Sequence, residues 1–185
     1  MKMKNVKVFL ADGFEEIEAL TVVDILRRAC VETTTVSVTK KDVAEGAHGI
    51  CVKADELFEE ADFHETEMLV LPGGMPGTLN LQHTQVSGNF CRHTGKQKNM
   101  WLRSARLRVF LETRNVGWET CWLLSVFEEK LTGAEVVREP VVLDQNVITS
   151  RGMGTAIPFA LKLVEVLCGM ERAEEVRKSI IYNEE

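Results

Sequence analysis

Three short segments carry residue types that could do chemistry. The first, Ala11–Glu18, supplies several carboxylates after an apolar run. If Glu18 faces a cleft, burial would raise its pKa and let it hold a proton near neutral pH. The second contains Gly73 and Gly74, whose backbone N–H groups could approach a ligand as an oxyanion hole or anion nest. The third, Thr149–Thr155, places glycines before a predicted helix, where an anion could bind.

Each segment also has a purely structural interpretation. Glu15 and Glu16 could simply complement the positive end of a helix dipole. Glu18 could be a solvated carboxylate on a helix surface, and the Gly-Gly pair only a tight turn. The segment with the Gly-Gly pair is not a phosphate loop, because no Gly-Lys-Ser/Thr follows it. The glycines of the third segment could serve close packing alone.

The first half of the chain predicts the elements that position these segments. Val6–Ala11 is a buried strand that ends in the turn Asp12-Gly13, and Glu32–Thr39 is a second strand. Between them, the spacing predicts a helix over Glu15–Cys30, with an apolar face made of Ile17, Leu20, Val23 and Leu26. A strand, a helix and a strand over about 35 residues form a βαβ unit, which implies a parallel sheet.

Further elements follow along the chain. We expect strands at Gly49–Val52 and Met68–Leu71, a short acidic helical turn at Asp55–Glu60, a hairpin of Val141–Leu143 with Val147–Thr149, and helices over 154–167 and 171–180 with Gly169 between them. The pattern predicts one α/β domain over residues 1–185, with an open parallel sheet and helices on both faces. Sites in such sheets form beyond the carboxyl ends of the strands, where the first two segments lie.

Composition limits the class of protein. The 185 residues are 45% hydrophobic and 27% charged with a net charge of −6, which excludes disordered, collagen-like and coiled-coil proteins. No apolar run approaches a membrane span, and the start MKMKNVKVFL is too short for a secretory signal, so we expect a cytoplasmic protein. The five cysteines lack CxxC pairing, which favours free thiols, and Cys30 and Cys168 at helix ends are expected to be structural. The four histidines lack paired spacing, so no metal site is expected.

One segment has a foreign composition. Residues 85–126 hold seven Lys or Arg against two Asp or Glu and all three tryptophans, whereas the rest of the chain is strongly acidic. Within it, 100–111 fits both an amphipathic basic helix and, in its second half, an alternating strand. A basic, tryptophan-bearing patch could bind nucleic acid or a membrane surface, but a solvated face is the simpler interpretation, and we expect neither partner.

The motifs KVFLADGFEEIEALTVVDILRRA, MLVLPGGMPGT and VITSRGMGTAIPFALKLVEVLCG resemble the DJ-one/ThiJ/PfpI superfamily, specifically its small ThiJ-like branch. The resemblance covers about 4–84 and 127–182. It implies a flavodoxin-like fold, a homodimer, no metal or organic cofactor, and small dicarbonyl or glycated substrates. Members are glyoxalases, protein deglycases and redox-responsive chaperones. Glu18 matches the glutamate that hydrogen-bonds the reactive cysteine, and Gly73 and Gly74 match the oxyanion pocket.

The family nucleophile is missing from this sequence. In the family it is a cysteine in a string resembling AAICAAPS. This cysteine lies on a strand-to-helix turn, and that position lowers the pKa of the thiol and exposes its sulfur. Here the corresponding segment is NMWLRSARLRVFLE, and neither Cys91 nor Cys121 has a suitable context. In a shifted reading frame, the codons from the last base of Met100 to the first bases of Phe110 can spell VAAICAAPSV, with the cysteine codon across Ser104 and Ala105. We therefore interpret 85–126 as a frameshifted segment, arising from a sequencing error or real insertions and deletions.

Two functions stay open at this point. The restored sequence predicts a cofactor-free cysteine glyoxalase or deglycase. The printed chain also fits a non-catalytic dimeric chaperone or binding domain on the same fold. If the printed sequence is real, we expect the central strand, its turn and the nucleophile to be lost, and the protein to be unstable or inactive.

Overall fold

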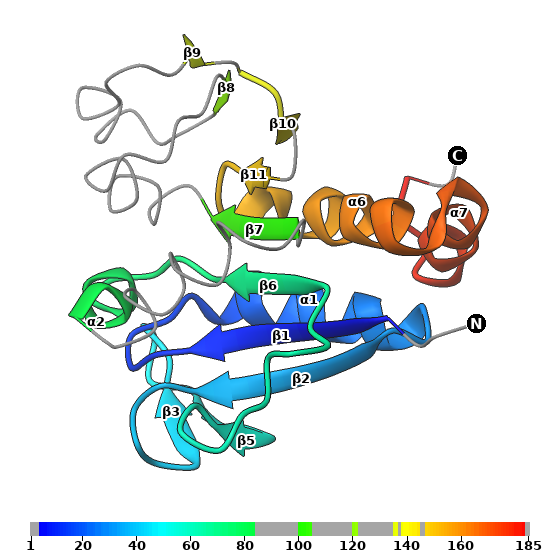
Figure 1. Cartoon of the computed structure of the whole chain (residues 1–185). Coiled ribbons are helices and arrows are strands. Elements are labelled where there is room, and N and C mark those ends of the chain that lie inside the picture. The colour runs from blue at the N-terminus through cyan, green and yellow to red at the C-terminus, as the bar shows by residue number, and fades with distance from the viewer. Residues whose placement is uncertain are drawn as a thin grey trace.

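A seven-stranded sheet runs through the protein in the order β10-β11-β7-β6-β1-β2-β5 (Figure 1). The computed structural model describes residues 4–83, 100–104, 120–121, 135–136, 138–144 and 147–183. All neighbouring strands of this sheet are parallel except the hairpin of β10 with β11. Its strands are β1 (Asn5–Leu10), β2 (Glu32–Ser37), β5 (Glu56–Leu57), β6 (Met68–Leu71), β7 (Met100–Ser104), β10 (Val141–Asp144) and β11 (Val147–Ser150).

The remaining elements flank this sheet or form small pairs. Two short pairs are β3 (Val43–Glu45) with β4 (Cys51–Lys53) and β8 (Thr120–Cys121) with β9 (Glu135–Val136). The helices are α1 (Glu16–Arg28), α2 (Gly77–His83), a 3-10 turn at Met153–Thr155, α6 (Ala156–Cys168) and α7 (Met170–Ser179). The predicted βαβ unit, the hairpin and the two C-terminal helices are thus confirmed, and the fold is a flavodoxin-like α/β fold.

Alternating side chains of β1 pack into two apolar clusters on opposite faces of the sheet, as a strand buried on both sides requires. Val6, Val8 and Leu10 belong to the larger cluster, which includes the buried sides of α1 and α6. Phe9 belongs to the smaller one, where Leu81 of α2 and the rings of Phe58 and Phe63 cover the sheet. The central strand is therefore fixed from both faces, and the position of its carboxyl end is fixed with it.

The buried face of α1 differs from the predicted one. Val23 and Leu26 are buried as expected, but Ile17 is 50% exposed and Leu20 36% exposed. The buried side includes Ala19, Val22 and Ile25 instead. Apolar residues occupy more than half of this helix, and the periodicity alone does not say which of them contact the sheet.

The expected helical turn at Asp55–Glu60 is wrong for its first part. Glu56 and Leu57 form β5, which pairs with the end of β2 at the sheet edge. Asp55 is held by the backbone N–H and hydroxyl of Thr35, each at 2.8 Å, and Glu56 pairs with the buried ammonium of Lys7. Side-chain contacts over long sequence separations therefore select the extended backbone.

The central strand β7 forms, so the expectation that the printed sequence loses it is wrong. Met100–Ser104 lies between β6 and β11, with Leu71 opposite Arg103 and Ser150 opposite Ser104. A strand at this place provides hydrogen-bond partners for the backbone N–H and C=O groups on the facing edges of β6 and β11. Without it, these groups would lack partners in the interior. Backbone pairing does not depend on which side chains the strand carries. The expected turn after the strand and the rest of 85–126 fall outside the described residues, apart from Thr120 and Cys121.

The C-terminal elements lie on the same face of the sheet as α1 (Figure 1). α1 packs against α6, and α6 against α7. Gly169 separates the last two helices with φ 93°, a backbone conformation that L residues rarely adopt. None of the helices in the described part of the chain has the length and apolar character needed to cross a membrane.

Candidate functional site at the carboxyl edge of the sheet

The three candidate segments converge at the carboxyl ends of the parallel strands. Glu18 comes from the first turn of α1, after β1, and the two glycines follow β6 after one residue, Pro72. The third segment joins β11 to α6. A small cavity between them is lined by Glu18, Val70, Leu71, Pro72, Ser150, Gly152, Ala156 and Phe159. The site thus lies where an open α/β sheet is expected to hold one.

Glu18 is half-buried and tied to the glycine turn. Its Oε2 accepts a hydrogen bond of 2.7 Å from the backbone N–H of Gly73, and its other oxygen, Oε1, lies on the side of Gly152. The contact fixes the carboxylate against the end of β6 and leaves it part of the cavity wall. A carboxyl group in this position can, when ionised, accept a proton from a ligand held in the cavity and, when protonated, donate one to it.

Gly74 provides the tightest packing at the site. Its φ is +100°, and a Cβ there would overlap the N atom of Glu15 and the carbonyl oxygen of Gly13, with the carbonyl carbon of Phe14 at 2.6 Å. The N–H of Gly73 already binds Glu18. Among the contacts of the described residues, the N–H of Gly74 donates no hydrogen bond. Gly74 is therefore the better candidate donor toward a ligand anion.

The third segment is closed by its own hydrogen bonds. The hydroxyls of Ser150 and Thr155 are 2.6 Å apart, and the Thr155 hydroxyl donates to the carbonyl of Gly152 at 2.9 Å. Ser150 is 3% exposed. These contacts explain the residue types of the segment by turn geometry, while Ser150 and Gly152 still line the cavity.

The end of β7 completes the edge. Ser104 is the last residue of the strand and pairs with Ser150, a cavity residue, while Arg103 pairs with Leu71, another. The shifted frame would place its cysteine codon across Ser104 and Ala105. The backbone therefore brings the carboxyl end of β7 beside the cavity residues Leu71 and Ser150.

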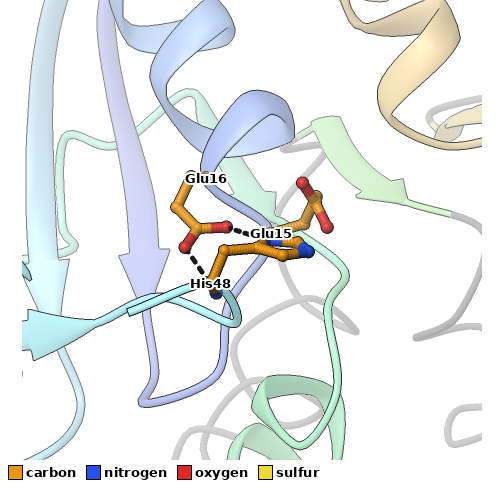
Figure 2. A group of neighbouring side chains, drawn as sticks. All are labelled: Glu15, Glu16 and His48. Atoms are coloured by element: carbon orange, nitrogen blue, oxygen red, sulfur yellow. Dashed lines mark hydrogen bonds and ion pairs between the residues drawn. The ribbon is translucent and has the colours of Figure 1, made fainter. Parts of the chain in front are cut away.

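Glu15, Glu16 and His48 form a second cluster beside the site (Figure 2). Each offers one ligand atom, and these atoms lie within 4.8 Å of one another, so the trio could hold a metal ion. The spacing of the histidines in the sequence does not predict this cluster. The two carboxylates come from the start of a helix, whereas His48 comes from the distant turn between β3 and β4.

Hydrogen bonds explain the trio without an ion. Both oxygens of Glu16 accept from His48, one from its backbone N–H at 2.7 Å and one paired with Nδ1 at 2.8 Å. Burial opposes ionisation of Glu16, but these hydrogen bonds outweigh it and lower its pKa. The same contact, with the nearby charge of Glu15, raises the pKa of His48. Glu16 is thus an anchor for the β3–β4 turn, which goes beyond the predicted dipole role.

Three cysteines have side chains that the structure describes, and none of the three is buried. Cys30, Cys51 and Cys168 are free and exposed, which agrees with free thiols and contradicts a structural role for Cys30 and Cys168. Cys51 lies on β4, far along the chain from the cavity residues. None of these three lies in the cavity wall.

The fold and site define a class: flavodoxin-like α/β proteins with a carboxylate and a glycine turn at the carboxyl edge of a parallel sheet. The model of the DJ-1/PfpI family matches residues 4–166. The chain belongs to this family.

Individual relatives agree. DJ-1 homolog B of Arabidopsis thaliana is 32% identical over 96% of this chain, and the glutathione-independent glyoxalase DJ-1 of Schizosaccharomyces pombe is 27% identical over 96% of this chain and 98% of its own length. The crystal structure of Drosophila melanogaster DJ-1beta superposes with a TM-score of 0.90 at 27% identity, over 97% of this chain and 98% of that one. The chain spans less than half of Arabidopsis homologs B and A, 41% and 46% of their lengths.

Proposed function

We propose that this chain derives from a cofactor-free cysteine glyoxalase or protein deglycase that acts on small dicarbonyl compounds or their adducts. The observation that carries the proposal is the hydrogen bond between Glu18 and Gly73 at the cavity, beside the end of β7. The Schizosaccharomyces pombe relative, named as a glutathione-independent glyoxalase, supports the reaction class.

The reaction assigns a role to each group. A thiolate at the end of β7 would add to the aldehyde carbon of methylglyoxal, and the carbonyl oxygen would take the negative charge. The Gly74 N–H would donate to that oxygen. Glu18 would then move a proton from the former aldehyde carbon to its neighbour, and water would release the product as lactate. The net change is the addition of one water molecule, so no redox partner or cofactor is required.

The printed chain lacks the nucleophile in our proposal, because residues 85–126 are translated out of frame. The register of β7 supports this assignment, since Ser104 stands at the strand end that the cavity residues surround. Independent DNA reads across codons 84–127 test it. Reads that give the printed frame without ambiguity would exclude a sequencing error.

Activity measurements separate the parts of the proposal. Lactate release from methylglyoxal is measured for the printed chain, for the chain with VAAICAAPSV in place of 101–110 and the family frame restored through 126, and for that chain with Glu18→Gln. We expect turnover only in the restored chain, with a loss of at least a hundredfold in the glutamine variant. A serine at the restored cysteine is the matched control. Turnover by the printed chain would disprove the assignment of the nucleophile.

A non-catalytic chaperone or binding domain is the second candidate, favoured by the absence of the AAICAAPS-like string. It predicts that the printed chain suppresses aggregation of a heat-denatured client such as citrate synthase without consuming methylglyoxal. The Glu18→Gln variant should protect equally well, because the carboxylate has no part in such binding.

We also propose a homodimer in the cytoplasm. Ile17 and Leu20 of α1 and Ile50 of the β3–β4 turn are exposed, at 50%, 36% and 53%. Apolar side chains of this size gain stability when a second copy covers them. The free thiols fit a reducing compartment. Sedimentation of the wild type against Ile17→Glu tests the dimer, and cell fractionation tests the location.

A further inference from the structure

Three ligand atoms suited to a metal ion lie beside the cavity without lining it. The carboxylates of Glu15 and Glu16 and the imidazole of His48 each offer one such atom, and these atoms lie within 4.8 Å of one another (Figure 2). None of the three residues belongs to the cavity wall around Glu18. The trio is therefore separate from the groups to which the proposed reaction gives a role.

Glu16 is a buried anion that has no permanent cation beside it. The residue is 3% exposed, and its carboxylate packs so closely that a Cβ at Gly46 would overlap Oε1. Within the described part of the chain its ion-pair partner is His48, whose side chain is 65% exposed and is charged only when protonated. No lysine or arginine of these residues pairs with Glu16. Buried carboxylates are normally paired with a cation or bound to a metal, so this position favours a cation.

The contact between Glu16 and His48 already has the dimensions of a metal site. Oε1 of Glu16 accepts from the backbone N–H of His48 at 2.7 Å, and Oε2 lies 2.8 Å from Nδ1. Two ligands on one Zn²⁺ stand about 3 Å apart, because Zn–N and Zn–O bonds are about 2.0–2.1 Å long. An ion can therefore take the place of the proton between Oε2 and Nδ1 after a small rotation of the exposed imidazole, while Oε1 keeps its hydrogen bond.

Glu15 is in place to supply the third ligand. It directly precedes α1, and its backbone N–H donates to the carbonyl of Gly73 at 2.8 Å, which fixes its main chain. Its carboxylate makes no hydrogen bond or ion pair with the residues that the structure describes. Figure 2 shows this carboxylate beside the imidazole of His48. A side-chain rotation of Glu15 is thus enough to close the trio around one ion.

We propose that Glu15, Glu16 and His48 bind one divalent transition-metal ion, and that Zn²⁺ fits them best. Zinc accepts imidazole nitrogen and carboxylate oxygen in tetrahedral geometry, with water in the fourth position. The imidazole disfavours Mg²⁺ and Ca²⁺, which prefer oxygen ligands. Binding forms the metal–ligand bonds and releases the proton between Glu16 and His48 to solvent, with no change of oxidation state.

The ion would connect two segments that are distant in the sequence. The carboxylates belong to the start of α1, and His48 belongs to the β3–β4 turn. A hydrogen bond from the N–H of Ala47 to the carbonyl of Phe14, at 2.8 Å, already joins the turn to the loop before α1. Zinc would add a second and stronger connection between them, and would act on stability without taking part in catalysis.

Calorimetric titration of the full chain with Zn²⁺ and with Mg²⁺ tests the site. Accessible thiols are first blocked with iodoacetamide, because exposed cysteines also bind zinc. We expect one zinc ion per blocked chain with micromolar affinity, and binding of Mg²⁺ that is weaker by at least a hundredfold. Zinc binding that disappears when the thiols are blocked, or equal affinity for the two ions, would overturn the proposal.

Variants assign the ligands. His48→Gln and Glu15→Gln should each weaken zinc binding by at least tenfold, because each removes one of three ligands. His64→Gln is the matched control, because it removes an exposed histidine that lies outside the trio. Zinc should also raise the melting temperature of the wild type and of His64→Gln, but not that of His48→Gln. Equal zinc affinity in the wild type and His48→Gln, or an equal loss in the two histidine variants, would refute the assignment of the site.

Discussion

Replacement of Gly74 by alanine should destabilise the protein strongly, because two independent costs add at this position. Its φ of +100° is in the region that L residues avoid, which costs roughly 1–2 kcal/mol. The new Cβ would also overlap the backbone of Gly13 and Glu15. Forcing two packed backbone segments apart adds about 1–3 kcal/mol. We therefore expect a total loss of about 3 kcal/mol in the free energy of unfolding.

Gly49 provides the matched control. Its φ of +79° carries a similar backbone cost, but a Cβ there would meet nothing within 4 Å. Gly49→Ala should therefore lose only about 1–2 kcal/mol. Urea unfolding followed by circular dichroism gives both free energies, and the slope of each transition shows whether the unfolded states match. If Gly74→Ala costs no more than Gly49→Ala, the glycine turn does not pack rigidly against the start of α1, and the geometry assigned to the site is wrong.

Three further predictions concern contacts away from the cavity. Because the pKa of His48 is raised in the folded state, its contact with Glu16 contributes its full stabilisation below about pH 6.5, and this stabilisation is lost as the pH rises through the folded-state pKa of His48. Because the pKa of Glu16 is lowered, the same contact contributes stabilisation above about pH 4.5, and this is lost as the pH falls through the folded-state pKa of Glu16. The stability difference between wild type and His48→Gln in urea should therefore shrink from pH 6 to pH 8, and a constant difference would contradict the linkage. Glu56→Gln should cost about 3 kcal/mol in urea unfolding by leaving the buried ammonium of Lys7 without its anion, whereas the double variant with Lys7→Met should recover most of the loss. Arg172→Ala should lower the melting temperature, because the last carbonyls of α1 lose their donor, and an unchanged melting temperature would show that water replaces it.

The sequence predicted those parts of the fold whose signals are local. β6 has the predicted bounds, Met68–Leu71, and Gly169 ends the helix that precedes it, because an apolar run and a glycine stop need no distant partner. The contact between Glu18 and Gly73 could also be predicted from the sequence, since the two residues follow neighbouring parallel strands.

Long-range contacts account for the elements that local patterns missed. Glu16 is buried because His48, 32 residues away, satisfies its carboxylate, and no helical periodicity encodes that partner. Glu56 lies in a strand because β2 pairs with its backbone and the ammonium of Lys7 pairs with its carboxylate. β7 was expected to be lost on side-chain grounds, yet its place is set by the open edges of the strands on either side.

The packing of α1 on α6 has a consequence for how the chain is held together. α1 belongs to the first half of the sequence and α6 to its last quarter, and Arg172 adds backbone contacts between the same two regions. The peptide linkage through the segment of foreign composition is thus not the only connection between them. A cut in that segment would leave two pieces that share a buried helix interface, in the manner of a split protein. The interface would then keep Glu18 next to Gly152 even where covalent continuity is lost.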